Sequence, residues 1–269
     1  MKKMSMLVCI FGILGCGVSR ESSVNVSMST GFRRDVGSLV PSIPPPPRTR
    51  YPQVVVAYDA LMVSLSALKA SYNENRDSFL PRKSSFDDNI FNQFEADLGS
   101  DEARDDVYAS LKHEVVSLEN LELVINILTS FGENQLNREF ALRLLYRLRA
   151  SAMYIREVID EDEGILNQDN LNVLLLSNDL KGITLLKSYL DEMLNLRNVV
   201  VDMAKGMLLS AAGAVDDVEV LSLLASIINS QGALKESINS SAKQSLRDLR
   251  TKIEHSVNDL VLGVVRAKF

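Results

Sequence analysis

Hydrophobic residues recur every three or four positions through most of the chain after residue 53, which is the period of an amphipathic α-helix. The first stripe consists of Tyr58, Leu61, Leu65, Leu68 and Tyr72. Residues 73–85 are polar and contain Pro81, so they predict a connection. A short second helix follows and ends at Gly99, with one apolar face formed by Phe86, Ile90, Phe94 and Leu98.

Ser100 is suited to cap a third helix, whose first acidic residues stand near the positive end of the helix dipole. Its stripe consists of Val107, Leu111, Leu118, Leu121, Ile125 and Leu128, and Gly132 ends the helix. A fourth helix begins near Asn134 and closes at the acidic turn 160–164. Its inward positions are Phe140, Leu144, Leu148, Ile155 and Ile159.

Residues 169–212 predict one long helix, or two shorter ones divided at Gly182. The apolar positions in this stretch include Leu174, Leu185, Leu186, Leu190, Leu194 and Met203. Asp216 or Asp217 caps a short helix that reaches Ile228. The last helix runs from about Ala233 to near the end, with Leu246, Leu249, Ile253, Val257, Leu260 and Val264 inside. Hairpin signals are absent, so the predicted fold is all-α, a multi-helix bundle of about seven or eight helices.

The N-terminus has a different pattern. Met1-Lys2-Lys3 precedes an apolar run over residues 6–14, which is too short to span a bilayer as a helix and matches the apolar core of an export signal. The run ends in Ile13-Leu14-Gly15-Cys16, which resembles the lipobox of bacterial lipoproteins. That resemblance implies a signal peptide over residues 1–15 and a diacylglyceryl group on Cys16. The alternative is a buried apolar helix with an incidental cysteine.

Residues 16–52 predict a disordered tether between the lipidated cysteine and a helical domain over residues 53–269. Six of the seven prolines fall between Pro41 and Pro52, and four of them are consecutive. Such a run favours the extended polyproline II conformation. The apolar stretches after residue 53 are amphipathic and interrupted by charges, so the expected membrane contact is through the N-terminal lipid alone.

The composition offers little material for catalysis. The net charge of −6 and the pI near 5.1 argue against nucleic-acid binding, which needs a basic face. His113 and His255 lack a second histidine or a cysteine at helical spacing, which predicts solvated or edge positions. The acidic run from Asp160 places Gly164 fifth, whereas a calcium-binding EF-hand loop needs glycine at its sixth position. We therefore expect no enzyme, no cofactor and no metal site.

Charge is distributed unevenly between the third and fourth helices. Residues 101–133 hold eight acidic and two basic residues, whereas residues 138–156 hold five arginines and one glutamate. The candidate partner-binding residues are therefore Arg138, Arg143, Arg147, Arg149 and Arg156. Two interpretations stand: the basic helix packs beside the acidic one through ion pairs, or its arginines form a docking face for an acidic host protein or glycan.

The lipobox, the polar tether and a cysteine-free helical domain together resemble the outer-surface lipoproteins of Borrelia spirochaetes. Residues 154–158 (Tyr-Ile-Arg-Glu-Val) are similar to a short stretch of relapsing-fever surface lipoproteins, whereas the 17 arginines against 12 lysines depart from that family. The resemblance implies a lipid-anchored outer-membrane protein at the cell surface that binds a host macromolecule, such as a complement regulator or another plasma or matrix protein. The alternatives are an antigenic coat protein without a dedicated ligand and a periplasm-facing envelope scaffold. The oligomeric state stays open.

Overall fold

The computed structural model describes residues 52–130, 135–240 and 244–266, which belong to the unit Thr49–Phe269. The fold is all-α, as the sequence predicts, and no β-strand occurs in the described ranges. The predicted signal peptide, Cys16 and nearly all of the predicted tether lie outside the described residues.

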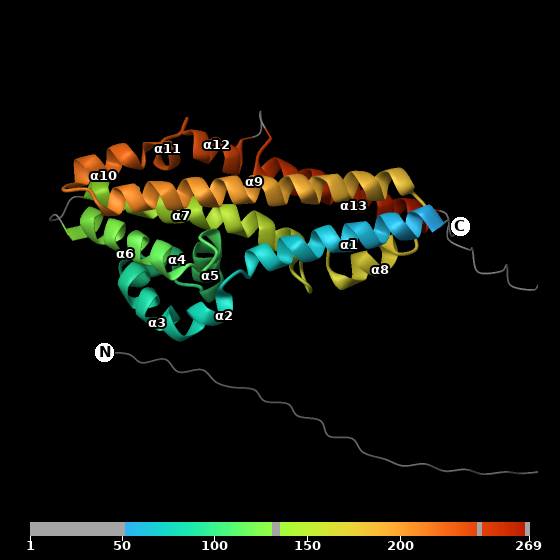
Figure 1. Ribbon diagram of the computed structural model, residues 1–269, viewed down its shortest axis with the longest axis horizontal. Helices are drawn as coiled ribbons and strands as arrows, with labels where there is room; N and C mark the ends of the chain where they lie inside the picture. Colours follow the sequence, from blue (N-terminus) through green and yellow to red (C-terminus); the bar gives the residue numbers. More distant parts are fainter. Residues whose placement is uncertain (1–51, 131–134, 241–243, 267–269) are drawn as a thin grey trace, which may run out of the picture. The chain divides into compact units, whose positions relative to one another are not determined.

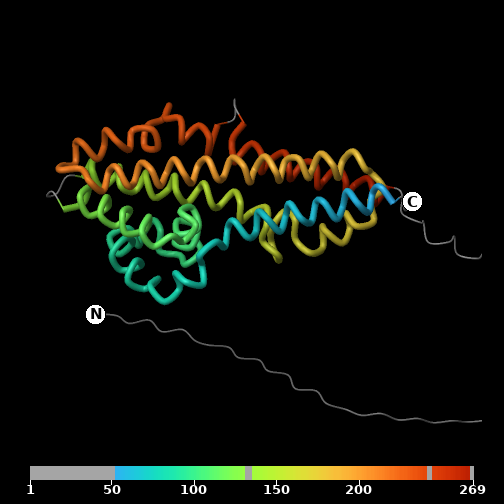
Figure 2. Tube along the Cα trace, in the orientation of Figure 1, coloured from blue at the N-terminus to red at the C-terminus, as the bar shows by residue number. Residues whose placement is uncertain are grey.

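Four long helices lie side by side and form the centre of the domain (Figures 1 and 2). They are α1 (Pro52–Tyr72), α7 (Gln135–Ile159), α9 (Leu180–Ala212) and α13 (Leu246–Arg266). The longest, α9, contacts the other three. Its buried positions alternate in steps of three and four, as in a coiled-coil seam, and include Ile183, Leu186, Leu190, Met193, Arg197 and Val200.

Shorter helices cover this centre. α5 (Asp101–Ser110) packs on α7, and α6 (Val115–Ser130) packs on both α7 and α9. α8 (Gln168–Leu174) packs on α13. The remaining cover over α7 and α9 consists of α10 (Asp217–Leu223), α11 (Ala225–Ile228) and α12 (Ala233–Asn239). All the inward positions predicted for α13 are buried, because its hydrophobic period matches a single helix.

The predicted polar connection over residues 73–85 is wrong, because residues 76–98 are continuously helical. They form α2 (Arg76–Phe79), α3 (Lys83–Phe86) and α4 (Glu95–Leu98), with the 3₁₀ turns η1 (Leu80–Arg82) and η3 (Asn92–Phe94) and the π-turn η2 (Asp87–Phe91). Pro81 stands at the start of η1, where its missing N–H removes no helical hydrogen bond. Phe79 is buried, and its ring centroid lies 4.6 Å from that of Tyr108. Aromatic burial therefore folds a segment that Pro81 alone marks as a break.

The predicted third helix is two helices. α5 ends at Ser110, and Lys112 and His113 both adopt left-handed backbone angles, with φ of 56° and 53°. The Asn75 side chain donates a hydrogen bond of 3.1 Å to the Lys112 carbonyl oxygen, and the Lys112 ammonium lies 2.9 Å from the Glu74 carboxylate. Contacts with the turn after α1 therefore stabilise a break that no glycine or proline marks.

Two further predicted boundaries move. The division between α8 and α9 lies before Asp179, whose side chain caps α9 by accepting a hydrogen bond from the Gly182 N–H. Gly182 is inside the first turn, and a Cβ there would lie 2.6 Å from Leu260 of α13. The predicted last helix is divided into α12 and α13. On α9, Leu185 and Met203 are exposed rather than inside, because the buried seam follows Leu186 and Leu190.

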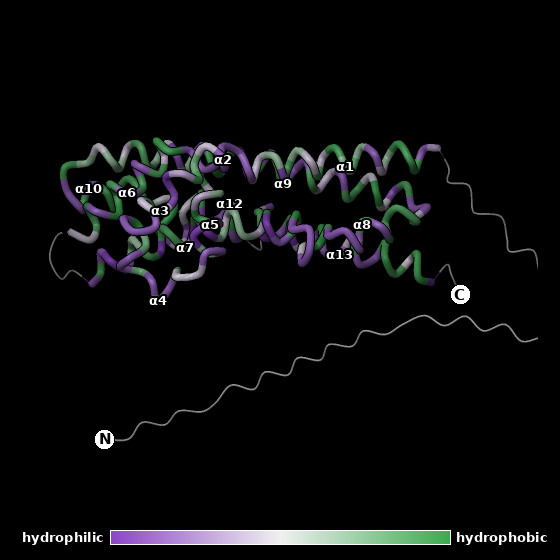
Figure 3. Tube along the Cα trace, turned by 90° about the horizontal axis from the view of Figure 1, so that it is seen from below, coloured by the Kyte–Doolittle hydropathy of each residue, from purple (hydrophilic) through white to green (hydrophobic). Residues whose placement is uncertain are grey.

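One helical stretch in the described part of the chain, Pro52–Leu98, is long and apolar enough to cross a membrane by length and composition. A core helix of a globular domain passes the same test. Hydrophobic residues recur along both α1 and α9 (Figure 3), and Leu61, Leu65 and Leu68 are fully buried where α1 packs against α9.

Candidate functional site

A polar network crosses the core, beginning at Arg197 of α9. Its side chain is 1% exposed and occupies a position of the buried seam where an apolar residue is usual. The guanidinium donates hydrogen bonds of 3.1 Å and 2.8 Å to the carbonyl oxygens of Ser71 and Ala109, and one of 3.2 Å to the Ser71 hydroxyl. Burial lowers the pKa of Arg197 to about 10, so it carries its charge at neutral pH. The cation joins α9 to α1 and α5.

The network continues through Tyr72 to the buried carboxylate of Asp106. Arg197 lies over the Tyr72 ring, 5.7 Å from its centroid, and the Tyr72 hydroxyl donates a hydrogen bond of 3.0 Å to Asp106. Arg156 of α7 donates to both Asp106 oxygens, at 3.0 and 3.2 Å. Burial raises the pKa of Asp106, and the Arg156 hydrogen bonds oppose that rise only in part. The network thus connects four helices through a buried cation, a phenol, a carboxylate and a second cation.

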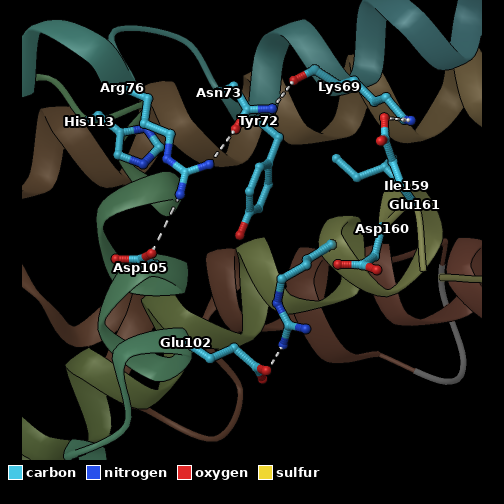
Figure 4. A pocket seen from close by; sticks show the side chains of 11 residues that line it. Lys69, Tyr72, Asn73, Arg76, Glu102, Asp105, His113, Ile159, Asp160 and Glu161 are labelled. Carbon is cyan, nitrogen blue, oxygen red and sulfur yellow. Dashed lines mark hydrogen bonds and ion pairs between the residues drawn. The ribbon is translucent and has the colours of Figure 1, made fainter. Parts of the chain in front are cut away.

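Above this network lies a depression of about 440 Å³, formed where α1, α5, α7 and the acidic turn meet (Figure 4). All of its charged residues except Asp160 form ion pairs across it. Lys69 lies 2.9 Å from Glu161, Arg76 lies 3.7 Å from Asp105, and Arg156 lies 2.6 Å from Glu102.

A second depression of about 500 Å³ shares Glu102, Arg156 and Asp160 with the first and extends to α13. Together they form what we call the polar groove. Its charged residues are eight acids, Glu102, Asp105, Glu157, Asp160, Glu161, Asp162, Glu163 and Glu254, and four bases, Lys69, Arg76, Arg156 and Arg250. The groove is therefore net acidic.

No cluster of three or more His, Cys, Asp or Glu side chains able to hold a metal ion occurs within residues 52–130, 135–240 and 244–266. In the acidic turn, the Asp160 carboxylate accepts hydrogen bonds of 2.9 Å from the N–H groups of Asp162 and Glu163. The hydrogen bond from Glu163 is the main reason that the pKa of Asp160 is lowered. The Asp160 carboxylate thus has its hydrogen-bond partners within the acidic turn itself.

The two histidines differ. His255 is exposed, as predicted, but His113 is 4% exposed, which corrects the expectation of a solvated or edge position. Its Nδ1 donates to the Glu74 carbonyl oxygen at 3.2 Å, and its ring packs on Phe79. Burial lowers the pKa of His113 to about 4, so the imidazole is uncharged at neutral pH and a weak base. The left-handed break that ends α5 turns this side chain inward.

The five candidate arginines of α7 have different surroundings. Arg156 pairs with Glu102 and Asp106 of α5, which is the intramolecular packing that one of the two sequence interpretations describes. Arg138 lies over the Phe94 ring and donates a hydrogen bond of 2.6 Å to the Gln93 carbonyl oxygen. Arg143 lies 3.9 Å from Glu139, and both side chains are about half exposed.

Arg147 and Arg149 differ from the other three. Neither forms an ion pair or a side-chain hydrogen bond with any described residue, and Nε of Arg149 is buried without a partner. Arg149 lies near Asp106, whereas Arg147 lies near Tyr154 on the side of α7 that faces α12 and α13. Their separation agrees with the helical spacing, because residues two positions apart lie on opposite sides of a helix.

The sequence interpretation missed Arg197. A usable signal exists, because a charged residue occupies a core position in the three-four spacing of Leu190, Met193, Arg197 and Val200. Comparisons with known protein families, with curated proteins and with solved structures find no match to this chain. Its function must therefore follow from its own residues and their geometry.

Proposed function

We propose that this chain is a lipid-anchored bacterial surface lipoprotein whose helical domain binds a host macromolecule through the surface of α7. The sequence support is Ile13-Leu14-Gly15-Cys16, which resembles a lipobox and implies attachment at Cys16. The proposed role is binding rather than catalytic, because all four basic side chains of the polar groove are engaged in ion pairs with carboxylates of the groove.

The observation that carries the binding proposal is the unequal pairing of charges on α7. Arg138 and Arg156 are engaged with neighbouring helices, and these contacts explain their presence structurally. Neither Arg147 nor Arg149 forms an ion pair in the described part of the chain, although Arg149 lies near Asp106 and its Nε is buried. Guanidinium groups with free donors at a protein surface favour recognition of carboxylate or sulfate groups on a partner.

The anchor is tested by growing cells with labelled palmitate and comparing the native protein with Cys16→Ser and Cys9→Ser. We expect label in the native protein and in the Cys9→Ser control, and none in Cys16→Ser. On detergent phase separation, Cys16→Ser should also move from the detergent to the aqueous phase, because two or three acyl chains dominate membrane attachment. Equal labelling of all three proteins would contradict lipidation at Cys16.

Display at the surface is tested with a non-specific protease added to intact cells. The domain should be lost while a periplasmic control protein survives. Survival of the domain until the envelope is broken would refute the host-facing proposal and favour the envelope scaffold.

The antigenic-coat alternative predicts no ligand. The binding proposal predicts instead that cells displaying the protein adhere to immobilised plasma or matrix proteins. This adhesion should weaken as the salt concentration rises and in the variants Arg147→Glu and Arg149→Glu. Adhesion that is absent, or that both reversals leave unchanged, would remove this face from the proposal.

A further inference from the structure

Two arginines without ion-pair partners lie on the side of α7 that faces α12 and the beginning of α13, and both are near Tyr154. Arg147 and Tyr154 are seven residues apart, which places them on one face of α7, about two turns or 10 Å apart along the helix axis. The Tyr154 hydroxyl donates a hydrogen bond of 2.7 Å to Asn239, so this face looks toward the end of α12.

Arg247 reaches the same face from α13. α7 and α13 run in the same direction in Figures 1 and 2, and Nε of Arg250 lies 2.8 Å from the Glu157 carboxylate. One turn earlier on each helix stand Arg247 and Tyr154, so these two residues are level with each other. Consistent with this register, burial raises the pKa of Tyr154, and the charges of Arg247, Arg147 and Arg250 oppose the rise.

The donors available at this place are the two guanidinium groups of Arg147 and Arg247. The neighbouring charges are already used: Arg250 pairs with Glu157 and Glu254, and Asp248 pairs with Lys252. The Tyr154 hydroxyl is committed to Asn239. Arg247 is exposed and Arg147 is half-buried, and neither guanidinium group has a hydrogen-bond or ion-pair partner among the described residues.

The surroundings decide which anion suits the pair. Glu157, Arg250 and Glu254 lie within one or two helical turns of Tyr154 or Arg247 and also line the net acidic polar groove. A long polysulfated glycan lying on Arg147 and Arg247 would run beside several carboxylates and be repelled. An acidic segment of a protein can present two carboxylates within about 10 Å and continue with neutral or basic residues along the groove.

We propose that Arg147 and Arg247, beside Tyr154, form an anion-binding site that receives carboxylates of an acidic segment of a partner protein. This inference rests on the proposed binding function and deepens it. It retains Arg147 from the arginines of α7 and adds Arg247 from α13.

The test uses the full-length lipidated chain in detergent micelles and two probes of defined charge. One is a fluorescent peptide with two glutamates three positions apart, about 10 Å in an extended chain, among neutral residues. The other is a fluorescent heparin-derived hexasaccharide. Fluorescence anisotropy gives the affinity for each. We expect the peptide to bind more tightly than the saccharide, and its affinity to fall as ionic strength rises from about 0.01 to 0.15 M.

Arg147→Gln and Arg247→Gln should each weaken peptide binding about tenfold, because each removes one charge-assisted donor group. The matched control is Lys181→Gln. Lys181 is exposed, has no ion-pair partner among the described residues, and precedes Gly182, which contacts Leu260 near the opposite end of α13. This control should bind the peptide as the native protein does, and all variants should keep the native circular dichroism and melting temperature.

The site is refuted if Arg147→Gln and Arg247→Gln bind like the Lys181→Gln control, or if neither probe binds. Tighter binding of the saccharide, lost in the same variants, would overturn the choice of a protein carboxylate. These outcomes are independent of palmitate labelling and protease access, so a failed site and a failed surface assignment are told apart.

Discussion

Arg197 donates a hydrogen bond of 2.8 Å to the main-chain carbonyl oxygen of Ala109, at a place where both residues are shielded from solvent. No carboxylate forms an ion pair with this buried guanidinium among the described residues. Carbonyl dipoles from α1 and α5 and the face of Tyr72 stabilise the charge instead. A cation solvated in this way makes the packing of three helices depend on one side chain.

We therefore expect Arg197→Ala to lower the free energy of unfolding by about 3 kcal/mol or more, since it leaves carbonyl groups unpaired beside a cavity. Arg197→Lys should lose less, because its ammonium retains the charge but cannot reach all three acceptors. Urea unfolding followed by circular dichroism measures both changes. Equal stability of Arg197→Ala and the native protein would show that the guanidinium makes no net contribution to the free energy of unfolding.

Tyr72 and Asp106 should be energetically coupled. Tyr72→Phe removes the hydroxyl that donates to Asp106, and Asp106→Asn removes the charge that Arg156 contacts. Because both changes disturb one buried network, the double variant should lose less than the sum of the single variants, by about 1 kcal/mol. A double-mutant cycle in urea measures this coupling, and strict additivity would contradict a shared network.

His113 should make the domain sensitive to mild acid. Its pKa is lowered by burial to about 4, below the value near 6.5 of an unfolded chain. The unfolded state therefore binds the proton first, and stability should fall as pH decreases from about 6.5 toward 4, by about 2–3 kcal/mol in total.

The control for this prediction is His113→Asn, which does not titrate and tolerates the left-handed backbone. Urea unfolding at several pH values should show a steeper loss for the native protein than for His113→Asn over that range. Parallel curves would mean that His113 is accessible to protons in the folded state.

Two glycines of α9 form a matched pair. A Cβ at Gly182 would lie 2.6 Å from Leu260 and 2.7 Å from the Asp179 carboxylate, whereas nothing lies within 4 Å of a Cβ at Gly206. Gly206→Ala should raise stability by about 0.5–1 kcal/mol, because alanine favours the helix. Gly182→Ala should lower it by about 1–3 kcal/mol through the clash with α13. Thermal melts measure both, and stabilisation by Gly182→Ala would contradict this close packing.

The periodic stripes determine most of the helices. α7 and α13 follow their predicted inward residues because a three-four spacing of large aliphatic side chains leaves one face to bury. Cys16 and its lipobox-like context are also local signals. A prediction of lipidation needs no tertiary structure, and it stays a prediction.

Only the tertiary structure decides where the third predicted helix breaks and which arginines keep free donors. The break at Lys112 and His113 depends on Glu74 and Asn75, which are distant in sequence and carry no local mark of the contact. A helical wheel places Arg147 and Arg156 on opposite sides of α7, nine positions apart, but only the packed structure shows that Arg156 meets Asp106 of α5 whereas Arg147 has no acidic neighbour to pair with in the described part of the chain. Sequence periodicity reports which side of a helix is buried, whereas the partner of each polar side chain follows from how helices pack in three dimensions.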